Sequence, residues 1–242
     1  MKIIDAHIHT SVRKNNFINP ITPDLNKLNK DIKKNDIEFV ISITSCIDEL
    51  TPLEYDDIIS LMKLNNKVKA VIGINPNKFN NKSLEKIEVG IKLNLIKGLK
   101  IYPGYYYFYP SDKVYDKFYK LAEKYDIPVI IHCGDTFKKN ALVKYSHPLE
   151  IDNLAVKYPK VKFIIAHLGN PWTLDAAEVV YKNENVYTDL SGLALGNKIT
   201  NMTKKRVLEA LDYIEDYNKV IYGSDWPLVD LTSYIKEIKS II

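Results

Sequence analysis

The sequence is poor in arginine and has no long apolar segment. Arg13 and Arg206 are the only arginines among its 34 basic residues, and the lysines are spread along the chain rather than gathered in a block. With a net charge of +4, this distribution gives no electrostatic support to nucleic-acid binding. No apolar run is long enough to span a bilayer, and the N-terminus lacks the pattern of a secretory signal. We therefore expect neither a membrane nor a nucleic-acid partner.

Cysteine is also scarce, which argues against a disulfide framework. The two cysteines, Cys46 and Cys133, suggest free thiols in a reducing compartment and hence a cytoplasmic protein. Cys133 directly follows His132, so on a strand the two side chains point to opposite faces. We expect Cys133 to be a packing residue rather than a metal ligand. With 46% hydrophobic residues in 242, the chain has ample material for a packed core, which excludes disordered and fibrous classes.

Strand and helix patterns alternate along the whole chain. Short runs rich in β-branched residues predict eight strands: 3–9, 39–44, 68–74, 96–102, 128–133, 161–167, 185–190 and 220–224. Between them, apolar residues recur at helical spacing. The helical segments are marked by Leu25, Leu28 and Ile32, by Ile58, Leu61 and Met62, by Leu84 to Leu95 with Ser83 as N-cap, by Val114 to Tyr125, and by starts near Pro148, Thr173, Thr203 and Leu231.

Eight strand–helix units in one chain of this length predict an α/β fold, a single-domain (β/α)8 TIM barrel covering residues 1–242. The loops after the strands are longer than those before them, as expected where chemistry occupies the C-terminal rim of the strands. A doubly wound open sheet is the competing fold. The sequence has no glycine-rich phosphate loop to support it, and an open sheet would not bring the first and eighth strand ends together.

Two histidines share one face of the first strand. In Asp5–His9, alternate side chains point to the same side, so the Cα atoms of His7 and His9 are expected roughly 7 Å apart. Three later strands also end in metal-binding residue types: His132, His167 and Asp225. In a closed barrel all these ends face one mouth, and the first and eighth strands are neighbours. Imidazoles and a carboxylate are the usual ligands of a catalytic zinc, manganese or iron ion.

The same strand ends resemble the metal-dependent amidohydrolase superfamily. The resemblance is to its amidohydrolase-related branch, which also contains decarboxylases such as aminocarboxymuconate semialdehyde decarboxylase. The motifs occur in the family's order along the whole chain: Asp5–His9, Gly98–Pro103, Ile131–Asp135, Ala166–Trp172, Asp189–Gly192 and Tyr222–Pro227.

The resemblance implies that His7, His9, His132 and Asp225 bind a divalent metal. We expect zinc, with manganese as the alternative, and one ion rather than two. A bound water would be made more acidic, and Asp225 would take its proton and pass it to the leaving group. His167 would then either donate to the developing oxyanion or orient the water, or bind a second ion.

Lys100 is the third candidate catalytic residue, and three roles are open for it. In binuclear relatives a lysine at the fourth strand end is carbamylated and bridges two metals. In the branch resembled here, single-metal sites are usual, and the lysine can remain an ammonium that faces the substrate. A third reading pairs Lys100 with a barrel carboxylate such as Asp5.

Arg13, Tyr102 and Asp135 are the candidate substrate-binding residues, at strand ends or in the loops that follow them. Arg13 could hold a substrate carboxylate, or simply be solvated. Tyr102 opens an aromatic loop, 102–110, that could form a wall for a ring-bearing small molecule. Exposed aromatic clusters also mark interfaces, so a homodimer contact is an equal alternative.

The predicted function is a metal-dependent hydrolase that uses activated water on an amide, ester or lactone carbonyl. Non-oxidative decarboxylation of an unsaturated or aromatic carboxylic acid at the same site is the alternative. A metal-dependent deoxyribonuclease would need an acidic residue where Lys100 stands and a basic groove that the composition does not reveal. A non-catalytic metal-binding barrel would bind metal without turnover.

Overall fold

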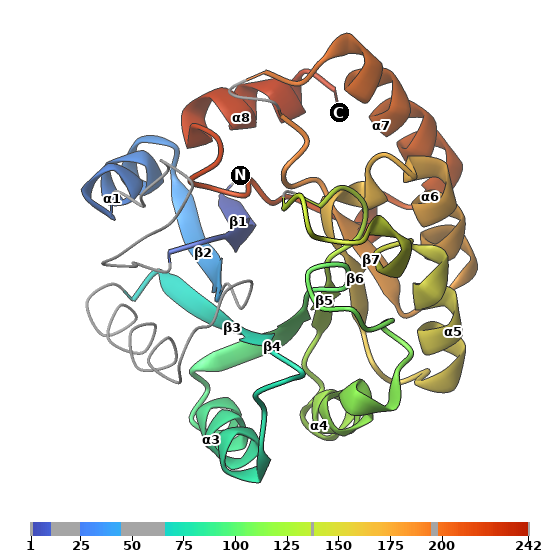
Figure 1. Ribbon diagram of the computed structural model, residues 1–242. Helices are drawn as coiled ribbons and strands as arrows, with labels where there is room; N and C mark the ends of the chain where they lie inside the picture. Colours follow the sequence, from blue (N-terminus) through green and yellow to red (C-terminus); the bar gives the residue numbers. More distant parts are fainter. Residues whose placement is uncertain (1, 11–24, 45–65, 137, 195–197, 242) are drawn as a thin grey trace.

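Eight parallel strands form the centre of the protein and helices surround them (Figure 1). The structure is a computed structural model that describes residues 2–10, 25–44, 66–136, 138–194 and 198–241. The predictions for Arg13, for Cys46 and for the helix containing Ile58, Leu61 and Met62 lie outside the described residues. The predicted single-domain TIM barrel is confirmed.

Each strand pairs in parallel with the next one along the chain. The strands are β1 Ile3–Ile8, β2 Ile37–Ile43, β3 Val68–Ile74, β4 Ile96–Ile101, β5 Val129–Ile131, β6 Phe163–Ile165, β7 Val186–Asp189 and β8 Val220–Ile221. Backbone bonds from Ala6 N to Tyr222 O (3.0 Å), from Asp225 N to His7 O (2.7 Å) and from His9 N to Trp226 O (2.7 Å) then join β1 to the end of β8. The barrel is therefore closed where His7, His9 and Asp225 lie.

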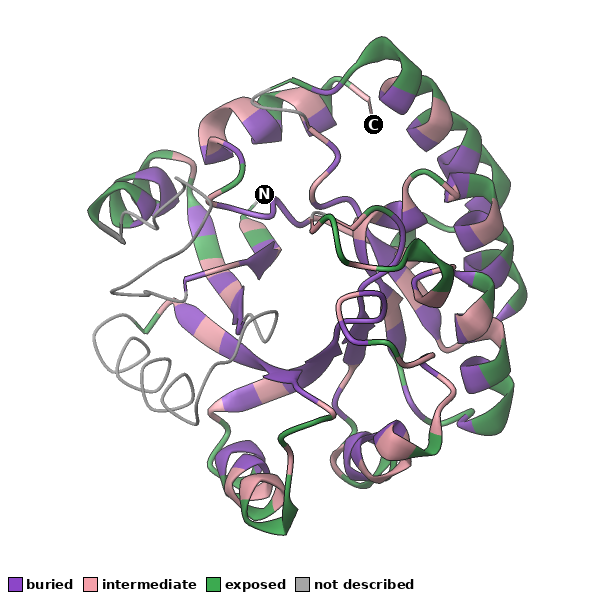
Figure 2. Ribbon diagram, in the orientation of Figure 1, coloured by how far each residue is buried: buried purple, intermediate pink, exposed green. Residues whose placement is uncertain are grey.

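The helices form the outer ring and bury their apolar faces against the strands (Figure 2). They are α1 Leu25–Lys34, α3 Asn81–Lys92, α4 Asp116–Tyr125, α5 Leu149–Lys157, α6 Thr173–Lys182, α7 Asn201–Ile214 and α8 Leu231–Lys239, with 3-10 turns at Lys113–Tyr115, Val143–Tyr145, Ala166–Gly169 and Tyr217–Lys219. None of the helices in the described ranges has the length and apolar character to cross a bilayer.

The start of α3 corrects one prediction. Asn80, rather than Ser83, is the N-cap, and its side chain accepts a hydrogen bond from Ser83 N at 3.0 Å. Asparagine in extended conformation at this position satisfies an otherwise free backbone donor of the first turn. Ser83 is the third residue of the helix, so the sequence analysis placed the N-cap three residues too late.

The strands end earlier than the sequence suggested, and this places the polar side chains beyond them. β5 ends at Ile131 and β6 at Ile165, so His132 and His167 follow strand ends instead of lying within strands. β8 ends at Ile221, so Asp225 lies four residues beyond its strand instead of directly after it. At His167 (φ 62°) and Asp225 (φ 65°) the backbone enters the left-handed region, which no strand residue adopts. The chain thus turns sharply at the mouth of the barrel and directs these side chains across it.

Candidate metal centre

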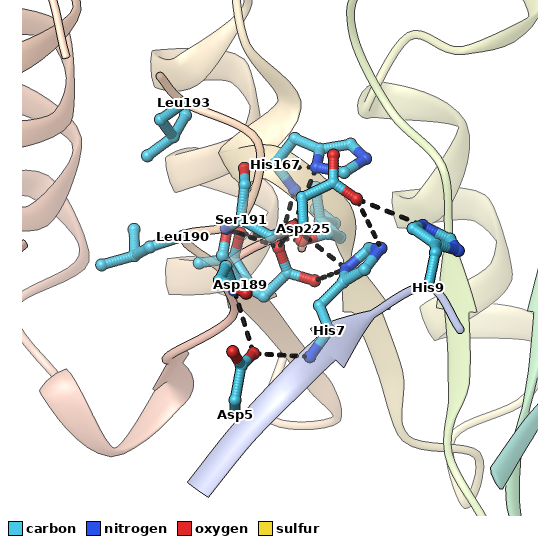
Figure 3. Close-up of polar contacts among 12 residues, drawn as sticks. Asp5, His7, His9, His167, Asp189, Leu190, Ser191, Leu193 and Asp225 are labelled. Carbon is cyan, nitrogen blue, oxygen red and sulfur yellow. Dashed lines mark hydrogen bonds and ion pairs between the residues drawn. The ribbon is translucent and has the colours of Figure 1, made fainter. Parts of the chain in front are cut away.

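His7, His9 and Asp225 meet at the junction of the first and eighth strands (Figure 3). One carboxylate oxygen of Asp225, Oδ1, lies 3.1 Å from His9 Nε2 and 3.8 Å from His7 Nε2. One donor atom from each of the three residues lies within 4.8 Å of the others. This spacing is suitable for ligands of one ion, and it comes from segments that are more than 200 residues apart in sequence.

Hydrogen bonds on the far side of each ring set the direction of the two imidazoles. His7 Nδ1 contacts Asp189 Oδ2 at 2.8 Å, and His9 Nδ1 contacts the carbonyl oxygen of Ile43 at 3.0 Å. Both rings therefore present Nε2 toward Asp225. In the described part of the chain, the buried Nε2 of His7 has no hydrogen-bond partner. A buried nitrogen lone pair of this kind fits a cation, and metal-binding histidines are usually oriented in this way.

The electrostatics of the cluster favour the forms that bind metal. Burial, assisted by the nearby charge of Lys100, lowers the pKa of His7 to about 4, so this imidazole is neutral at pH 7. Burial alone would raise the pKa of Asp225, but the hydrogen bond with His9 and the surrounding imidazoles outweigh it and hold that pKa well below its usual value. A neutral His7 imidazole beside the ionised Asp225 carboxylate suits zinc or manganese.

Asp189 and Ser191 are site residues to which the sequence analysis gave no role. Asp189 is the last residue of β7 and is 2% exposed, and Ser191 is fully buried. The carboxylate of Asp189 contacts His7 Nδ1 and accepts hydrogen bonds from the backbone N–H groups of His167 (2.9 Å) and Ser191 (3.0 Å). The signal was present, since Asp189 lies next to the end of the predicted strand 185–190, and a search of all strand ends for carboxylates would have found it.

His167 and His132 lie beside this cluster. The ring centroid of His167 is 5.0 Å from that of His7 and 5.2 Å from that of His132. His132 is buried, and its Nε2 contacts the carbonyl oxygen of Asp135 at 2.9 Å. Its Nδ1 makes no hydrogen bond with the described residues. His132 belongs to neither compact donor group of the described residues, and its role as a metal ligand stays a prediction.

A family model described as amidohydrolase matches residues 51–241. The chain belongs to the amidohydrolase family. It is a member of the branch that contains both hydrolases and decarboxylases, as the strand-end motifs predicted. The strand with His7 and His9 precedes the matched residues, so its place in the site rests on the contacts described above. No protein of curated function matches the sequence significantly.

Solved structures with the same fold share little sequence with this amidohydrolase. An uncharacterised TIM-barrel protein from Bordetella bronchiseptica is 17% identical with a TM-score of 0.78, over 99% of this chain and 91% of that one. A probable 2-pyrone-4,6-dicarboxylic acid hydrolase from Acinetobacter baumannii, with citric acid bound, is 16% identical with a TM-score of 0.71, over 100% and 92%. A 5-carboxyvanillate decarboxylase from Novosphingobium aromaticivorans, complexed with manganese and 4-hydroxy-3-methoxy-5-nitrobenzoic acid, is 12% identical with a TM-score of 0.67, over 97% and 88%.

Lys100 of the amidohydrolase is a buried amine inside the barrel. It is 1% exposed, and its Nζ has no hydrogen-bond partner among the described residues. Burial lowers the pKa of Lys100 to about 8, although Asp189 and Asp225 oppose this, so the ammonium form still predominates at pH 7. Of the three roles left open for Lys100, the pairing with Asp5 is not present in the structure, since neither Lys100 Nζ nor Asp5 Oδ2 has a hydrogen-bond partner among the described residues. Asp5 lies lower on β1, where one of its oxygens accepts from the backbone N–H groups of His7 (3.2 Å) and Ser224 (3.0 Å).

The remaining substrate-binding candidates lie near the same mouth. Tyr102 is 2% exposed, its hydroxyl donates to Thr44 O at 2.6 Å, and its ring centroid is 5.5 Å from Lys100 Nζ. The side chain of Asp135 is exposed. In the aromatic loop, Tyr105 packs edge-on against His132 with ring centroids 4.9 Å apart. The loop therefore borders the site, while substrate binding by Tyr102 and Asp135 and a dimer contact through this loop stay predictions.

Gly192 has no side chain, and His167 and Asp225 occupy the space that a side chain at this position would fill. Its φ is +64°, and a Cβ atom there would lie 2.9 Å from His167 Nδ1 and 3.0 Å from Asp225 Oδ2. We expect Gly192→Ala to cost about 1–2 kcal/mol of folding free energy through left-handed strain alone. We also expect it to weaken metal binding, because the added methyl group displaces Asp225. Urea unfolding and a zinc titration of the variant would check both, and unchanged affinity would contradict the crowded geometry.

The metal-free protein is expected to lose stability as the pH falls from 6.5 toward 4. Burial lowers the pKa of His7 to about 4, and it also lowers those of His132 and His167. As the pH falls from 6.5 toward 4, these histidines take up protons in the unfolded chain but stay neutral in the folded one, so acid favours unfolding. Burial raises the pKa of Asp5 to about 7, which acts in the opposite direction, but three imidazoles outnumber one carboxyl group.

Urea unfolding in the presence of a chelator measures this dependence. We expect the free energy of unfolding at pH 4.5 to be lower than at pH 6.5 by about 2 kcal/mol or more, since each pKa unit corresponds to about 1.4 kcal/mol. Equal free energies at the two pH values would show that the imidazoles are not held in their neutral form.

Proposed function

We propose that this amidohydrolase is a metal-dependent hydrolase that cleaves an amide, ester or lactone bond of a small molecule with water. The observation that carries the proposal is the position of Asp225, whose Oδ1 lies within 3.8 Å of Nε2 of both His7 and His9. The ionised Asp225 carboxylate therefore lies next to the two Nε2 atoms that would bind a cation, and next to any water bound to that cation. Such a group can accept a proton from water next to the ion.

His7, His9 and Asp225 would hold the ion, with His132 as the further ligand that the family resemblance implies. A divalent ion at this position supplies Lewis acidity, which polarises a substrate carbonyl and makes a neighbouring water more acidic. Zinc is the first choice because neutral imidazole and carboxylate ligands suit it, and manganese is the second because a relative of the same fold is complexed with it.

One ion fits the donor atoms better than two. The second compact group of the described residues, His7, His167 and Asp189, is already joined internally by the 2.8 Å contact between His7 Nδ1 and Asp189 Oδ2. A second ion there would have to break a buried charge-assisted hydrogen bond. Asp189 and His167 are therefore better suited to orienting His7 at the first metal site than to binding a second ion.

In the reaction, Asp225 would take a proton from the attacking water and later deliver it to the leaving group. The carboxylate suits the first step because its pKa is held well below the usual value, which keeps it ionised. Lys100, a buried ammonium on the neighbouring side of the barrel, would attract an anionic substrate group. A buried ammonium whose Nζ makes no hydrogen bond with any described residue also suits a carboxylic acid substrate, and this favours decarboxylation as the second candidate function.

Two substrate panels distinguish the candidates. The purified protein, loaded with zinc and separately with manganese, is incubated with lactones, esters and amides, and then with carboxylated phenols monitored for carbon dioxide. We expect the protein to hydrolyse members of the first panel. A chelator should abolish this activity, and added metal should restore it. Turnover of the second panel alone would replace hydrolysis with decarboxylation, and metal binding without turnover of either would favour a non-catalytic barrel.

A further inference from the structure

The hydroxyl group of Ser191 lies between two imidazoles and a carboxylate in the floor of the site (Figure 3). Its Oγ is 2.9 Å from His167 Nδ1, 3.0 Å from His7 Nδ1, and within hydrogen-bond distance of Asp189 Oδ1. Ser191 is fully buried, so no solvent competes for these contacts. A hydroxyl group has one proton to donate, and the position of that proton decides what the imidazoles can do.

The proton of the Ser191 hydroxyl goes to Asp189. Oδ1 of Asp189 also faces the backbone N–H groups of His167 (2.9 Å) and Ser191 (3.0 Å), which can only donate. That oxygen is therefore an acceptor, and the hydroxyl must donate to it. The lone pairs of Ser191 Oγ remain, and they face the two imidazole nitrogens as acceptors.

His167 Nδ1 consequently faces only acceptors. Besides Ser191 Oγ, it lies 3.2 Å from the carbonyl oxygen of the same residue. A ring nitrogen between two acceptors carries the proton, so neutral His167 has its hydrogen on Nδ1 and a lone pair on Nε2. The same holds for His7, whose Nδ1 faces the Asp189 carboxylate. None of the described residues makes a hydrogen bond with Nε2 of half-buried His167.

We propose that Ser191 is a positioning residue that fixes the tautomer of His167, so that Nε2 of His167 enters the reaction as a hydrogen-bond acceptor. Of the two roles that the sequence analysis left open for His167 without a second ion, this favours orienting water and excludes donation to an oxyanion by the neutral ring. The part of the proposal that concerns the reaction rests on the proposed function. The tautomer itself does not, because it follows from the hydrogen bonds alone.

Nitrogen-15 NMR of the histidine side chains tests the tautomer directly. The chelator-treated 242-residue chain contains only five histidines, and loss of signals in His167→Gln assigns those of His167. We expect the proton of wild-type His167 on Nδ1 and an unprotonated Nε2. In Ser191→Ala we expect a mixture that includes the Nε2-protonated form, because only the longer 3.2 Å contact with the carbonyl oxygen of residue 191 remains to hold the proton on Nδ1. A wild-type proton on Nε2, or an unchanged tautomer in Ser191→Ala, would overturn the proposal.

A matched control separates this effect from the loss of any buried hydroxyl. Ser146 is also fully buried, but its hydroxyl hydrogen-bonds to the carbonyl oxygens of Gly134 (2.8 Å) and Val143 (2.9 Å) and not to an imidazole. Ser146→Ala should leave the His167 tautomer unchanged. With a substrate from either panel, Ser191→Ala should lower kcat by about 10- to 100-fold with little change in KM, as expected for a group that orients a site residue. Failure to find a substrate would count against the proposed function and leave the tautomer result standing on its own.

Discussion

Asp225→Asn is expected to lower kcat by about 10³-fold or more, because the variant has no general base and a poorer metal ligand. The substitution preserves the size of the side chain. Asparagine also tolerates the left-handed backbone that residue 225 adopts, with φ 65°, so the fold should remain intact. Steady-state kinetics with the best substrate of the panels, together with circular dichroism, would measure both effects.

Asp126→Asn is the matched control for this variant. Asp126 also has a left-handed backbone (φ 49°), but it follows α4 at the opposite end of the barrel and its exposed side chain contacts Lys162 at 2.8 Å. It should retain wild-type activity. If Asp225→Asn keeps more than about a tenth of the wild-type kcat, Asp225 is not the base, given the 10²- to 10⁴-fold usually supplied by such groups.

Asp189→Asn is expected to destabilise the folded state by about 3 kcal/mol, because the buried carboxylate accepts from several donors at once. In the variant, a carboxamide NH₂ replaces one of the two acceptor oxygens. This NH₂ then faces a donor, either the His7 ring or the backbone N–H groups of His167 and Ser191, and no hydrogen bond can form there. Since His7 also loses the group that orients it, metal affinity should fall by about 10- to 100-fold. Urea unfolding and calorimetric titration with zinc would measure the two losses.

Asp152→Asn provides the comparison for the second variant. Asp152 lies on the surface of α5 and contacts Lys182 (2.6 Å) and Asn183 (2.8 Å) with a side chain that is 32% exposed. Exposed pairs of this kind contribute less than about 1 kcal/mol, so this variant should be close to wild type. Comparable stability losses in both variants would contradict the special role assigned to the buried carboxylate.

The barrel and the meeting of His7, His9 and Asp225 could be predicted because both follow from periodicity. Alternating strands and helices fix the parallel order, and closure of that order brings the first strand next to the eighth, whatever their separation in sequence. Residues at strand ends are then neighbours by construction. This is why a pattern distributed over the whole chain was sufficient to locate the cluster.

What could not be predicted depends on contacts between side chains and on local backbone turns. Asp189 lies near a predicted strand end, but its contacts with His7 and with the backbone of His167 depend on how these residues pack in three dimensions, which the sequence pattern does not give. Lys100 does not pair with Asp5 because the Asp5 carboxylate accepts hydrogen bonds from the backbone N–H groups of His7 and Ser224 instead. His167 and Asp225 adopt a left-handed backbone although neither is a glycine, so these two positions gave no sign of a turn and the strands were predicted too long.

An anomalous difference map from a crystal grown with manganese or zinc tests the central claim most directly. The account predicts one peak at the mouth of the barrel, about 2.0–2.2 Å from Nε2 of His7, Nε2 of His9 and an oxygen of Asp225. A map without a peak at this position, or with the ion bound away from these three side chains, would contradict it.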